Sequence, residues 1–530
     1  MRFSYKMVVI ILLALMVTIL IQCNSEPGKP AILTSPVTFT EADVTKGKIL
    51  AAGYCQSCHK LPDPALLDKE TWRSHVLPVM GLYLGIQPAA LVNNMSRSPQ
   101  DDLNYMPDSA MMDTVKWKQI VAYYTAKAPT HLPTPNRPLP LHQLPFFKIQ
   151  PTAAEWYSTI STASYVKIDT SVSPHRLIVN DGISNRLTVL NDKVQKLKSY
   201  TLDGAIVDMQ FQKNKAVFVT TIGRDLWANN FKNGNVKEIT IDNNGDIKPQ
   251  SQPLFAHLGR PVSVNIADFN GDGRMDYLIA QFGKMAGRLS WMENRGRDFK
   301  EHIIRQKPGC IKTVIDYNNK SKGPDIWTLF AQGDEGIFLY KNTGNGNFTE
   351  KQVLSFPPSY GSSSFELVDF NSDGFKDIIY TCGDNGDYSQ ILKPYHGLYI
   401  YLNDGKNNFT QKYFYPINGC YKAIARDFDG DGDLDIATIS CFPAAATPWE
   451  AFIYFENKGD FKFQTYTLPL NTPFQKGLTM DAADIDDDGK TDLLLGNGFY
   501  NSDKNNHTTQ PLFIVLKNIT SPGAKVTKNK

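Results

Sequence analysis

The chain has 530 residues, 42% of them hydrophobic, and its 55 basic and 53 acidic residues give a formal net charge of +2. This length exceeds that of one ordinary domain, and the hydrophobic content is normal for a globular protein. A charge so close to balance gives no support for nucleic-acid binding, which depends on a strongly basic surface.

The first residues form a targeting segment. A basic start precedes Val8–Ile21, an apolar run of about 14 residues that is short of the roughly 20 needed to span a membrane. We therefore predict a signal peptide over residues 1–23, an exported protein and a linker over residues 24–40. The run ends at Leu-Ile-Gln-Cys, which resembles a bacterial lipoprotein cleavage site with Cys23 lipidated, although Gln22 departs from the usual small residue. A signal peptide cut nearby and an uncleaved anchor are the alternatives.

A Cys-x-x-Cys-His motif follows at Cys55, Cys58 and His59. This spacing is the attachment pattern of c-type haem, in which the thiols add to the haem vinyl groups and the histidine binds the iron. A zinc site would need a second pair of ligands, and no βαβ unit that would carry a thioredoxin-like pair surrounds the motif. Because haem c is attached outside the cytoplasm, this prediction agrees with export.

Two helix-compatible segments flank the motif. Residues 45–52 lead into it, and Asp113–Lys127 places apolar and aromatic residues from Trp117 to Tyr124 on one face. Small class I cytochromes c pack an N-terminal and a C-terminal helix beside the haem. Residues 41–128 resemble such a small all-α cytochrome c domain.

The second axial ligand of the iron is expected to be a methionine. Met80 ends a Trp-Arg-Ser-His-Val-Leu-Pro-Val-Met stretch that is similar to the haem domain fused to repeat proteins in bacterial surface lipoproteins, and this similarity favours Met80. Met106, which precedes a proline before the last helix, is the alternative, and His75 is a further option. Packing against the haem edge is the competing interpretation for each methionine.

A proline-rich segment over residues 129–151 predicts a semi-rigid, extended linker. Beyond it, four loops repeat one acidic spacing. Side-chain oxygens at loop positions 1, 3, 5 and 9, with glycine at position 6, suit Ca²⁺ better than Mg²⁺. No glutamate stands at position 12 and strands follow each loop, so these are not EF-hands. The predicted calcium ligands are Asp268, Asn270, Asp272, Asp276, Asp369, Asn371, Asp373, Asp377, Asp427, Asp429, Asp431, Asp435, Asp484, Asp486, Asp488 and Asp492.

Each loop joins two strands, and two further strands follow. Four strands in about 50–60 residues are typical of a β-propeller blade, and the motifs resemble the FG-GAP/VCBS repeats of integrin-α-like propellers. The spacing predicts an all-β, seven-bladed β-propeller over residues 152–520, with six or eight blades as alternatives, and a tail over residues 521–530. The last blade lacks an outer strand, which Phe146–Gln150 of the linker is placed to supply.

Four cysteines lie in the propeller segment: Cys310, Cys382, Cys420 and Cys441. An exported protein permits disulfides, and four cysteines allow three pairings. Cys420 and Cys441 flank one loop symmetrically and are expected to face each other across a hairpin. A disulfide and two buried free thiols remain open.

One long polar loop stands out between two strands of the fifth blade. Its Gly-Asp-Asn-Gly-Asp-Tyr and Lys-Pro-Tyr-His-Gly segments resemble a stretch of the same cytochrome-fused family, and long loops in compact repeats often carry function. His396 with Asp384 or Asp387 is a weak candidate for ligand binding or proton abstraction. A loop stabilised by its own hydrogen bonds is the alternative. Ala444–Glu450 of the next blade is expected on the same rim.

The chain thus resembles bacterial surface lipoproteins in which a cytochrome c domain is fused to an FG-GAP/VCBS propeller. The resemblance implies electron transfer by a membrane-anchored lipoprotein, periplasmic or at the cell surface, that holds haem c and about four Ca²⁺. The propeller would bind a redox partner protein or a glycan, and no nucleic acid. One alternative is a dehydrogenase that oxidises a sugar or alcohol on the propeller, with or without a quinone cofactor. The other is an adhesion or ligand-binding module.

Overall fold

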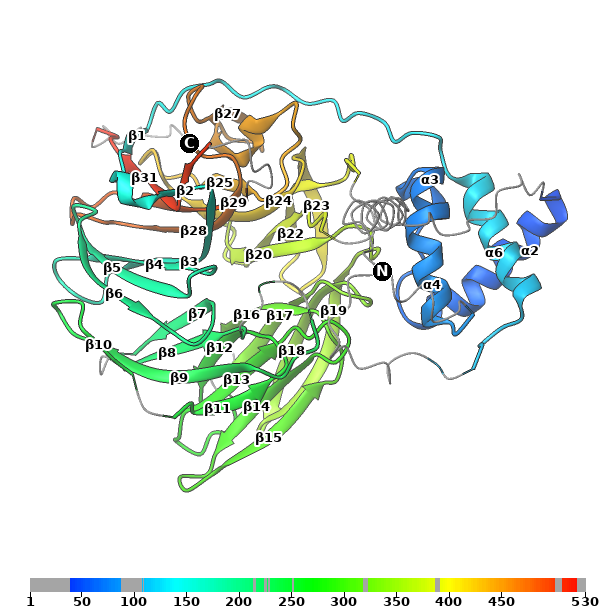
Figure 1. Ribbon diagram of the computed structural model, residues 1–530, viewed down its shortest axis with the longest axis horizontal. Helices are drawn as coiled ribbons and strands as arrows, with labels where there is room; N and C mark the ends of the chain where they lie inside the picture. Colours follow the sequence, from blue (N-terminus) through cyan, green and yellow to red (C-terminus); the bar gives the residue numbers. More distant parts are fainter. Residues whose placement is uncertain are drawn as a thin grey trace, which may run out of the picture.

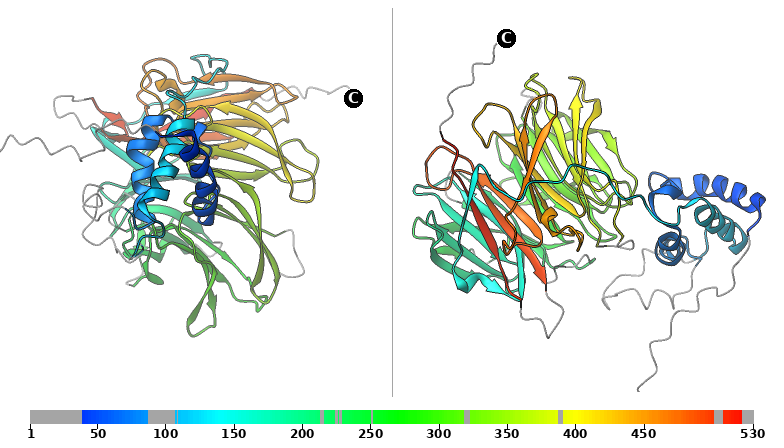
Figure 2. Two further views of the ribbon diagram at one scale, coloured as in Figure 1. Left: turned by 90° about the vertical axis from the view of Figure 1, so that its right-hand side faces the viewer. Right: turned by 90° about the horizontal axis from the view of Figure 1, so that it is seen from above.

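The computed structural model is described here for residues 39–521, except 87–106, 108, 213–215, 224–225, 227–228, 250–251, 318–322, 387–390 and 501–507. A small helical domain lies to one side of a much larger set of β-sheets, and an extended linker connects the two (Figures 1 and 2). Among the described residues, no helix combines the length and apolarity that crossing a membrane requires.

The helical domain is built on two long helices, α2 (Glu41–Tyr54) and α6 (Thr114–Lys127), with α3 (Lys69–Thr71), a π-turn over Trp72–Val76 and α4 (Leu77–Tyr83) between them. α2 begins at a capping box formed by Thr40 and Asp43. The two long helices cross at Gly47, where an added Cβ would lie 1.9 Å from the carbonyl oxygen of Gln119. Glycine therefore permits this close approach of the backbones.

The described strands form seven blades of four strands, all antiparallel within a blade. Blade one has β3 (Ile160–Asp169), β4 (Arg176–Asp181), β5 (Arg186–Asn191) and β6 (Lys196–Thr201). Blade two has β7 (Ile206–Phe211), β8 (Ala216–Thr221), β9 (Gly234–Ile241) and β10 (Ile247–Pro249), with β11 (Phe255–Leu258) also paired to β9. Blade three has β12 (Pro261–Ala267), β13 (Asp276–Gln281), β14 (Arg288–Asn294) and β15 (Phe299–Arg305).

The remaining blades continue in chain order. Blade four has β16 (Cys310–Asp316), β17 (Asp325–Phe330), β18 (Gly336–Gly344) and β19 (Asn347–Ser355). Blade five has β20 (Ser362–Val368), β21 (Asp377–Cys382), β22 (Gly397–Asn403) and β23 (Phe409–Pro416). Blade six has β24 (Cys420–Arg426), β25 (Asp435–Ser440), β26 (Phe452–Asn457) and β27 (Phe463–Thr467). Blade seven has β28 (Gly477–Ala483), β29 (Asp492–Tyr500), β31 (Phe513–Asn518) and β1 (Phe147–Gln150), while β2 (Tyr157–Ser158) pairs with β30 (Gln510–Pro511).

The blades close into a ring. The first strand of each blade contacts the first strand of the next, and β28 of blade seven contacts β3 of blade one. The end of β29 also pairs with the start of β3. Apolar clusters fill the space between neighbouring blades, as in the layer that joins blades six and seven around Phe428, Tyr454 and Leu493. These contacts make the fold a β-propeller.

The outermost strand of blade seven comes from the linker. β1 pairs antiparallel with β31, and Phe147 lies opposite Asn518. This is the position that the sequence analysis assigned to Phe146–Gln150. Phe147 is 3% exposed, and its ring lies 5.6 Å from that of Phe428 and 5.4 Å from that of Tyr454. The chain segment that precedes blade one therefore completes blade seven.

The linker is extended, and it is also held in place (Figure 1). The Arg137 guanidinium forms a buried ion pair with Glu450, lies 4.9 Å from the centre of the Trp449 ring, and donates to the carbonyl of Pro416. Further along, the backbone of Leu141 hydrogen-bonds to Thr465 and Thr467 of β27. The linker thus runs across blades five and six on fixed contacts.

The expectation that Cys420 and Cys441 face each other is wrong. Cys420 lies opposite Ser440, and a register shift follows it in β24, so that Cys441 falls beyond the paired strands. Neither cysteine is in a disulfide, nor are Cys310 and Cys382. Of the two open alternatives, the structure has free thiols.

Replacing the buried side chain of the closing strand β1 by alanine tests the ring closure. Phe147→Ala should lower the free energy of unfolding by roughly 3–5 kcal/mol, because it leaves a cavity between blades six and seven. Lys148→Ala, at the exposed neighbouring position of the same strand, should change it by less than about 0.5 kcal/mol. Chemical denaturation followed by tryptophan fluorescence measures both. Equal stability of the two variants would contradict closure by β1.

Candidate functional site

The Cys-x-x-Cys-His motif lies where α2 ends. Cys55 begins a 3₁₀ turn directly after this helix, its side chain is half-buried against the apolar core of the helical domain, and Cys58 is exposed. Burial, followed by the nearby Cys58 thiol, raises the pKa of Cys55 to about 11. Both thiols are free, and Nδ1 of His59 lies 2.9 Å from the carbonyl oxygen of Lys60.

The predicted axial methionine lies in the same part of the domain. Met80 is half-buried on α4 and packs against the apolar cluster that Cys55 also contacts. His75 is exposed, and Met106 lies outside the described residues. The two free thiols and the histidine of the motif, with Met80 on the apolar cluster that Cys55 contacts, fit the donor set of haem c. Met80 as the axial ligand stays a prediction.

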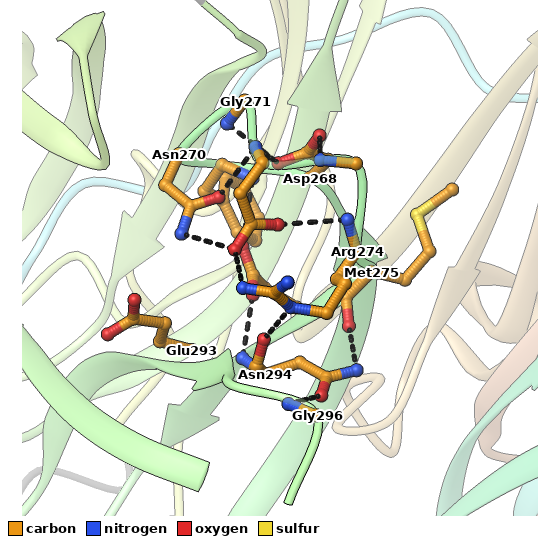
Figure 3. Close-up of polar contacts among 12 residues, drawn as sticks. Asp268, Asn270, Gly271, Arg274, Met275, Glu293, Asn294 and Gly296 are labelled. Atoms are coloured by element: carbon orange, nitrogen blue, oxygen red, sulfur yellow. Dashed lines mark hydrogen bonds and ion pairs between the residues drawn. The ribbon is translucent and has the colours of Figure 1, made fainter.

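The acidic loops connect the first and second strands of blades three, five, six and seven. In the loop of blade three, the Asp268 carboxylate accepts hydrogen bonds from the backbone of Gly271, at 2.7 Å, and of Gly273, at 2.9 Å (Figure 3). The glycine at position 6 has φ of +84° in this loop and between +82° and +94° in the other three. Only a left-handed residue allows this turn, so glycine is favoured there.

The aspartate at position 9 of each loop fastens three strands together. In blade three, the Asp276 carboxylate accepts from the backbone of Phe269, at 3.1 Å, and of Asn294, at 2.8 Å. The Asn294 side chain donates in turn to the carbonyl of Met275 (Figure 3). The same aspartate–asparagine pairs recur as Asp377–Asn403, Asp435–Asn457 and Asp492–Asn518. This aspartate therefore has a structural role with or without a cation.

Blade four keeps this fastening although its loop lacks the acidic spacing. Asp325 accepts from the backbone of Asn342 at 2.8 Å, and the Asn342 side chain donates to the carbonyl of Pro324 and to that of Phe269 in blade three. The aspartate–asparagine pair is thus a general feature of these blades. The side-chain oxygens at loop positions 1, 3 and 5 are the part that is specific to a cation site.

The four loops do not offer a cation equal surroundings. In blade six, carboxylate oxygens of Asp427, Asp429 and Asp435 lie within 4.8 Å of one another. Burial, with repulsion between the acids adding to it, raises the pKa of Asp429 to about 6 and that of Asp435 to about 7. Crowded carboxylates of this kind fit a Ca²⁺ ion.

Blade seven gathers Asp484, Asp486 and Asp492 in the same way, but an ammonium group stands among them. The Nζ atom of Lys517 lies 2.8 Å from Asp486 and 2.9 Å from Asp492. An internal cation therefore already neutralises two of the predicted calcium ligands. In blade three, the Arg274 guanidinium pairs with Asp272. Among the described residues, carboxylates gather within 4.8 Å of one another only in blades six and seven, not in blade five. Blade six is therefore the best fit for an added cation.

The long polar loop of blade five contacts the helical domain. Ile391 packs against the apolar cluster of that domain, and the Tyr395 hydroxyl donates to the carbonyl of Leu66 at 3.0 Å. Beside it, Nζ of Lys60 donates to the carbonyl of Ser355 in blade four at 3.2 Å. Lys60 directly follows His59, so the Cys-x-x-Cys-His motif lies next to this contact.

The structure does not bring the weak catalytic candidates together on an open surface. His396 is 2% exposed, and burial followed by the charge of Lys393 lowers its pKa well below the usual value. Asp384 instead accepts from the backbone of Gly386, and Asp387 lies outside the described residues. The Lys393 ammonium, itself buried, donates to the side chain of Asn385. These contacts stabilise the loop from within.

A buried carboxyl group lies behind this loop, and sequence reasoning missed it. Glu335, in the β17–β18 turn, is 1% exposed; one of its oxygens accepts from the backbone of Ser362 at 2.6 Å and the other has no partner among the described residues. Burial raises its pKa to about 8. No motif surrounds Glu335, so nothing in its local sequence distinguishes it from an exposed turn residue.

Sequence reasoning also missed the docking residues. Ile391 and Tyr395 lie inside a segment that was singled out, but for its polar residues. The expected position of Ala444–Glu450 beside that segment stays a prediction, and the ion pair of its Glu450 with Arg137 of the linker was not foreseen. The sequence offers two weak signals for these contacts: Arg137 is a single arginine in the proline-rich linker, and Ile391 is an isoleucine in a polar loop.

Comparisons with known proteins support the propeller. Residues 224–279 and 321–380 match the family described as FG-GAP-like repeat. Cartilage acidic protein 1 of Mus musculus is 24% identical over 290 residues, 51% of this chain and 42% of that protein. The Homo sapiens protein is 25% identical over 267 residues, 46% of this chain and 38% of that protein. The chain thus spans about two fifths of the length of these curated relatives.

Solved structures similar to the chain include the Dos1 propeller, at 9% identity and a TM-score of 0.41, covering 68% of this chain and 78% of that one. The N-terminal domain of Nup159 is similar at 10% identity and a TM-score of 0.40, covering 71% of this chain and 97% of that one. The chain contains FG-GAP-like repeats and folds as a β-propeller.

A charge placed in the docking contact should release the helical domain. Ile391→Asp buries a carboxylate against the apolar cluster, which is costly without a partner. We expect limited proteolysis to cut residues 129–145 several times faster in this variant, while the unfolding of the propeller is unchanged. Leu392→Asp is the matched control, since Leu392 is 54% exposed. Equal cleavage of both variants and the wild type would show that the contact does not hold the domain.

Proposed function

We propose that this protein is an exported ligand-binding β-propeller that carries a haem-c electron-transfer domain. The observation that carries the electron-transfer part is the Cys-x-x-Cys-His motif at the end of α2, with both thiols free and Cys55 beside the apolar cluster that Met80 also contacts. The ligand-binding part is supported by the FG-GAP-like repeats and by the similarity to cartilage acidic protein 1.

In this proposal Cys55 and Cys58 would hold the haem covalently, and His59 and Met80 would bind its iron. Haem c supplies reversible one-electron transfer when it is bound. The surrounding chain supplies an apolar core that excludes water, built on Trp72, Ile120 and Tyr124. A methionine ligand and a dry site both favour a higher reduction potential than a bis-histidine, solvated site would have.

The docking contact supports a joint role for the two domains. The residue after the motif histidine, Lys60, and the loop residues Ile391 and Tyr395 of blade five hold the motif near the propeller. A protein or glycan bound to the propeller would therefore lie on the same rigid unit as the haem. The proposed partner is a redox protein or a glycan outside the cytoplasm.

Residues 1–38, which include Cys23, lie outside the described part of the chain. Export, lipidation of Cys23 and anchoring in a membrane are proposed from the targeting segment alone. Covalent attachment of haem c outside the cytoplasm is consistent with them. A periplasmic and a cell-surface location both fit this proposal.

Haem attachment has a direct test. The full chain, expressed with a haem c maturation system, should carry one haem that resists acid–acetone extraction, and Cys55→Ser with Cys58→Ser should abolish it. Met80→Ala should keep the covalent haem but lose the methionine–iron charge-transfer band, whereas Met111→Ala, a 52% exposed control, should keep both. Wild-type protein without covalent haem would refute the electron-transfer proposal.

The same preparation separates electron transfer from the dehydrogenase alternative. Oxidised protein, with and without added pyrroloquinoline quinone and Ca²⁺, is mixed with a panel of sugars and alcohols. We expect no reduction of the haem α-band, because the proposed catalytic side chain, His396, is 2% exposed. Reduction by a sugar or alcohol would favour the dehydrogenase over the relay.

We also propose that Ca²⁺ binds the acidic loops and stabilises the propeller. Chelation should lower Tm, because the clustered carboxylates repel one another without a cation. The wild type should bind three Ca²⁺ rather than four, and Lys517→Met should add one, since it removes the ammonium between Asp486 and Asp492. Lys341→Met, at the matching position of blade four, should add none. An unchanged Tm on chelation would contradict the proposal that Ca²⁺ stabilises the propeller.

A further inference from the structure

The innermost strands of the seven blades share one irregularity. In each blade, the pairing of the first strand with the second strand shifts register near the start of the first strand. The residue that directly follows this shift therefore occupies the same structural position in every blade. In blades two, four, five and six these residues are Asp208, Lys312, Ser364 and Lys422. The equivalent positions form one ring around the propeller axis.

Charges of this ring act on one another across the axis. Burial lowers the pKa of Lys422, and the charges of Asp481 and Glu366 oppose this lowering. Lys422 belongs to blade six and Asp208 to blade two, yet the Asp208 charge also raises the pKa of Lys422. Lys312 and Lys422, two blades apart, also repel each other. Because blades two and six are not neighbours, these charges can interact only through the centre of the ring.

Two ammonium groups of the ring have no carboxylate within ion-pair distance among the described residues. Among the described residues, Nζ of Lys312 hydrogen-bonds to the Ser364 hydroxyl at 3.3 Å, and Nζ of Lys422 donates to the carbonyl of Met480 at 2.8 Å. Neither lysine is in an ion pair in the described part of the chain. Burial, followed by repulsion from Lys422, lowers the pKa of Lys312 to about 8.

Two of the three nearby acids are already paired with a basic side chain. Asp481 pairs with Lys167 at 3.1 Å, and Glu366 pairs with Arg426 at 2.6 Å. Asp208 accepts from the backbone of Val264 at 3.0 Å and from the side chain of Gln210. Asp208 has no ion-pair partner among the described residues, so its carboxylate balances one of the two ammonium groups. Positive charge still exceeds negative charge by one here, since three carboxylates face four basic groups: Asp208, Glu366 and Asp481 against Lys167, Lys312, Lys422 and Arg426.

We propose that Lys312, Ser364 and Lys422 form an anion site at the propeller axis that takes a carboxylate or phosphate group of a ligand. The three residues come from consecutive blades four, five and six. Two ammonium groups and a hydroxyl offer charge-assisted hydrogen bonds to one oxyanion, and lysine binds such groups as a point charge. The inference rests on the proposed ligand-binding role of the propeller and gives its ligand a negative charge.

Inorganic phosphate and acetate are the probes, titrated into the full-length protein against sodium chloride of equal ionic strength. One of the two anions should bind in calorimetry and raise Tm above the chloride control. Lys312→Met and Lys422→Met should each weaken this binding by roughly tenfold or more, because each removes one charged donor. Lys300→Met, exposed on the outer strand of blade three, should bind as the wild type does.

The outcomes are distinct. Binding of either anion that requires both lysines supports the site, and the preferred anion identifies the ligand group. Binding to neither anion, or equal binding by Lys312→Met and Lys300→Met, overturns it. In the absence of anion, neither lysine variant should have a lower Tm than the wild type, so that a loss of binding cannot be explained by unfolding. The absorbance spectrum of the same samples gives the haem content, which tests the haem proposal independently of anion binding.

Discussion

The pairing of β1 with β31 is the constraint on which the rest of the structure depends. Blade seven is incomplete without a strand from the linker, so the two ends of the propeller are joined in one sheet. The linker that supplies this strand also carries the helical domain, and the buried Arg137–Glu450 pair fixes its path over blades five and six. A buried pair of this kind is costly to break, because it leaves an uncompensated charge. Ring closure therefore also decides where the helical domain lies.

The second organising element is the aspartate–asparagine pair that fastens the first three strands of a blade. It appears in blades with the acidic loop and in blade four, which lacks it. The aspartate at position 9 thus satisfies backbone hydrogen bonds of the turn without a cation, and a cation would bind chiefly the side chains at the other loop positions. The blades differ in the surroundings of these side chains. Blade six has crowded acids with raised pKa values, whereas blade seven has the Lys517 ammonium among its acids. Loops with the same acidic spacing in the sequence thus differ in the charges that surround their carboxylates.

Much of the architecture could be predicted from the sequence, because turns and strand periodicity are local. The acidic loops, α2 and α6, and the closing strand at Phe147 all follow from short patterns. The docking of Ile391 and Tyr395 on the helical domain could not, since it joins residues more than 300 positions apart in the chain through one apolar contact and one hydroxyl. Likewise, the register shift in β24 moves Cys441 away from Cys420, and symmetry about a loop cannot reveal a bulge. Lys517 lies near its acids only because β31 returns beside β29.

The central claim is that the Cys-x-x-Cys-His domain is held against blade five, so that a group bound there and a ligand on the propeller belong to one body. Small-angle X-ray scattering of the full chain tests this most directly. The account predicts one compact distribution of interatomic distances that matches the docked arrangement of Figure 1 and does not change with ionic strength, because the contact is apolar and hydrogen-bonded. A broad distribution with a second, longer-distance peak would show a freely tethered helical domain and would contradict the account.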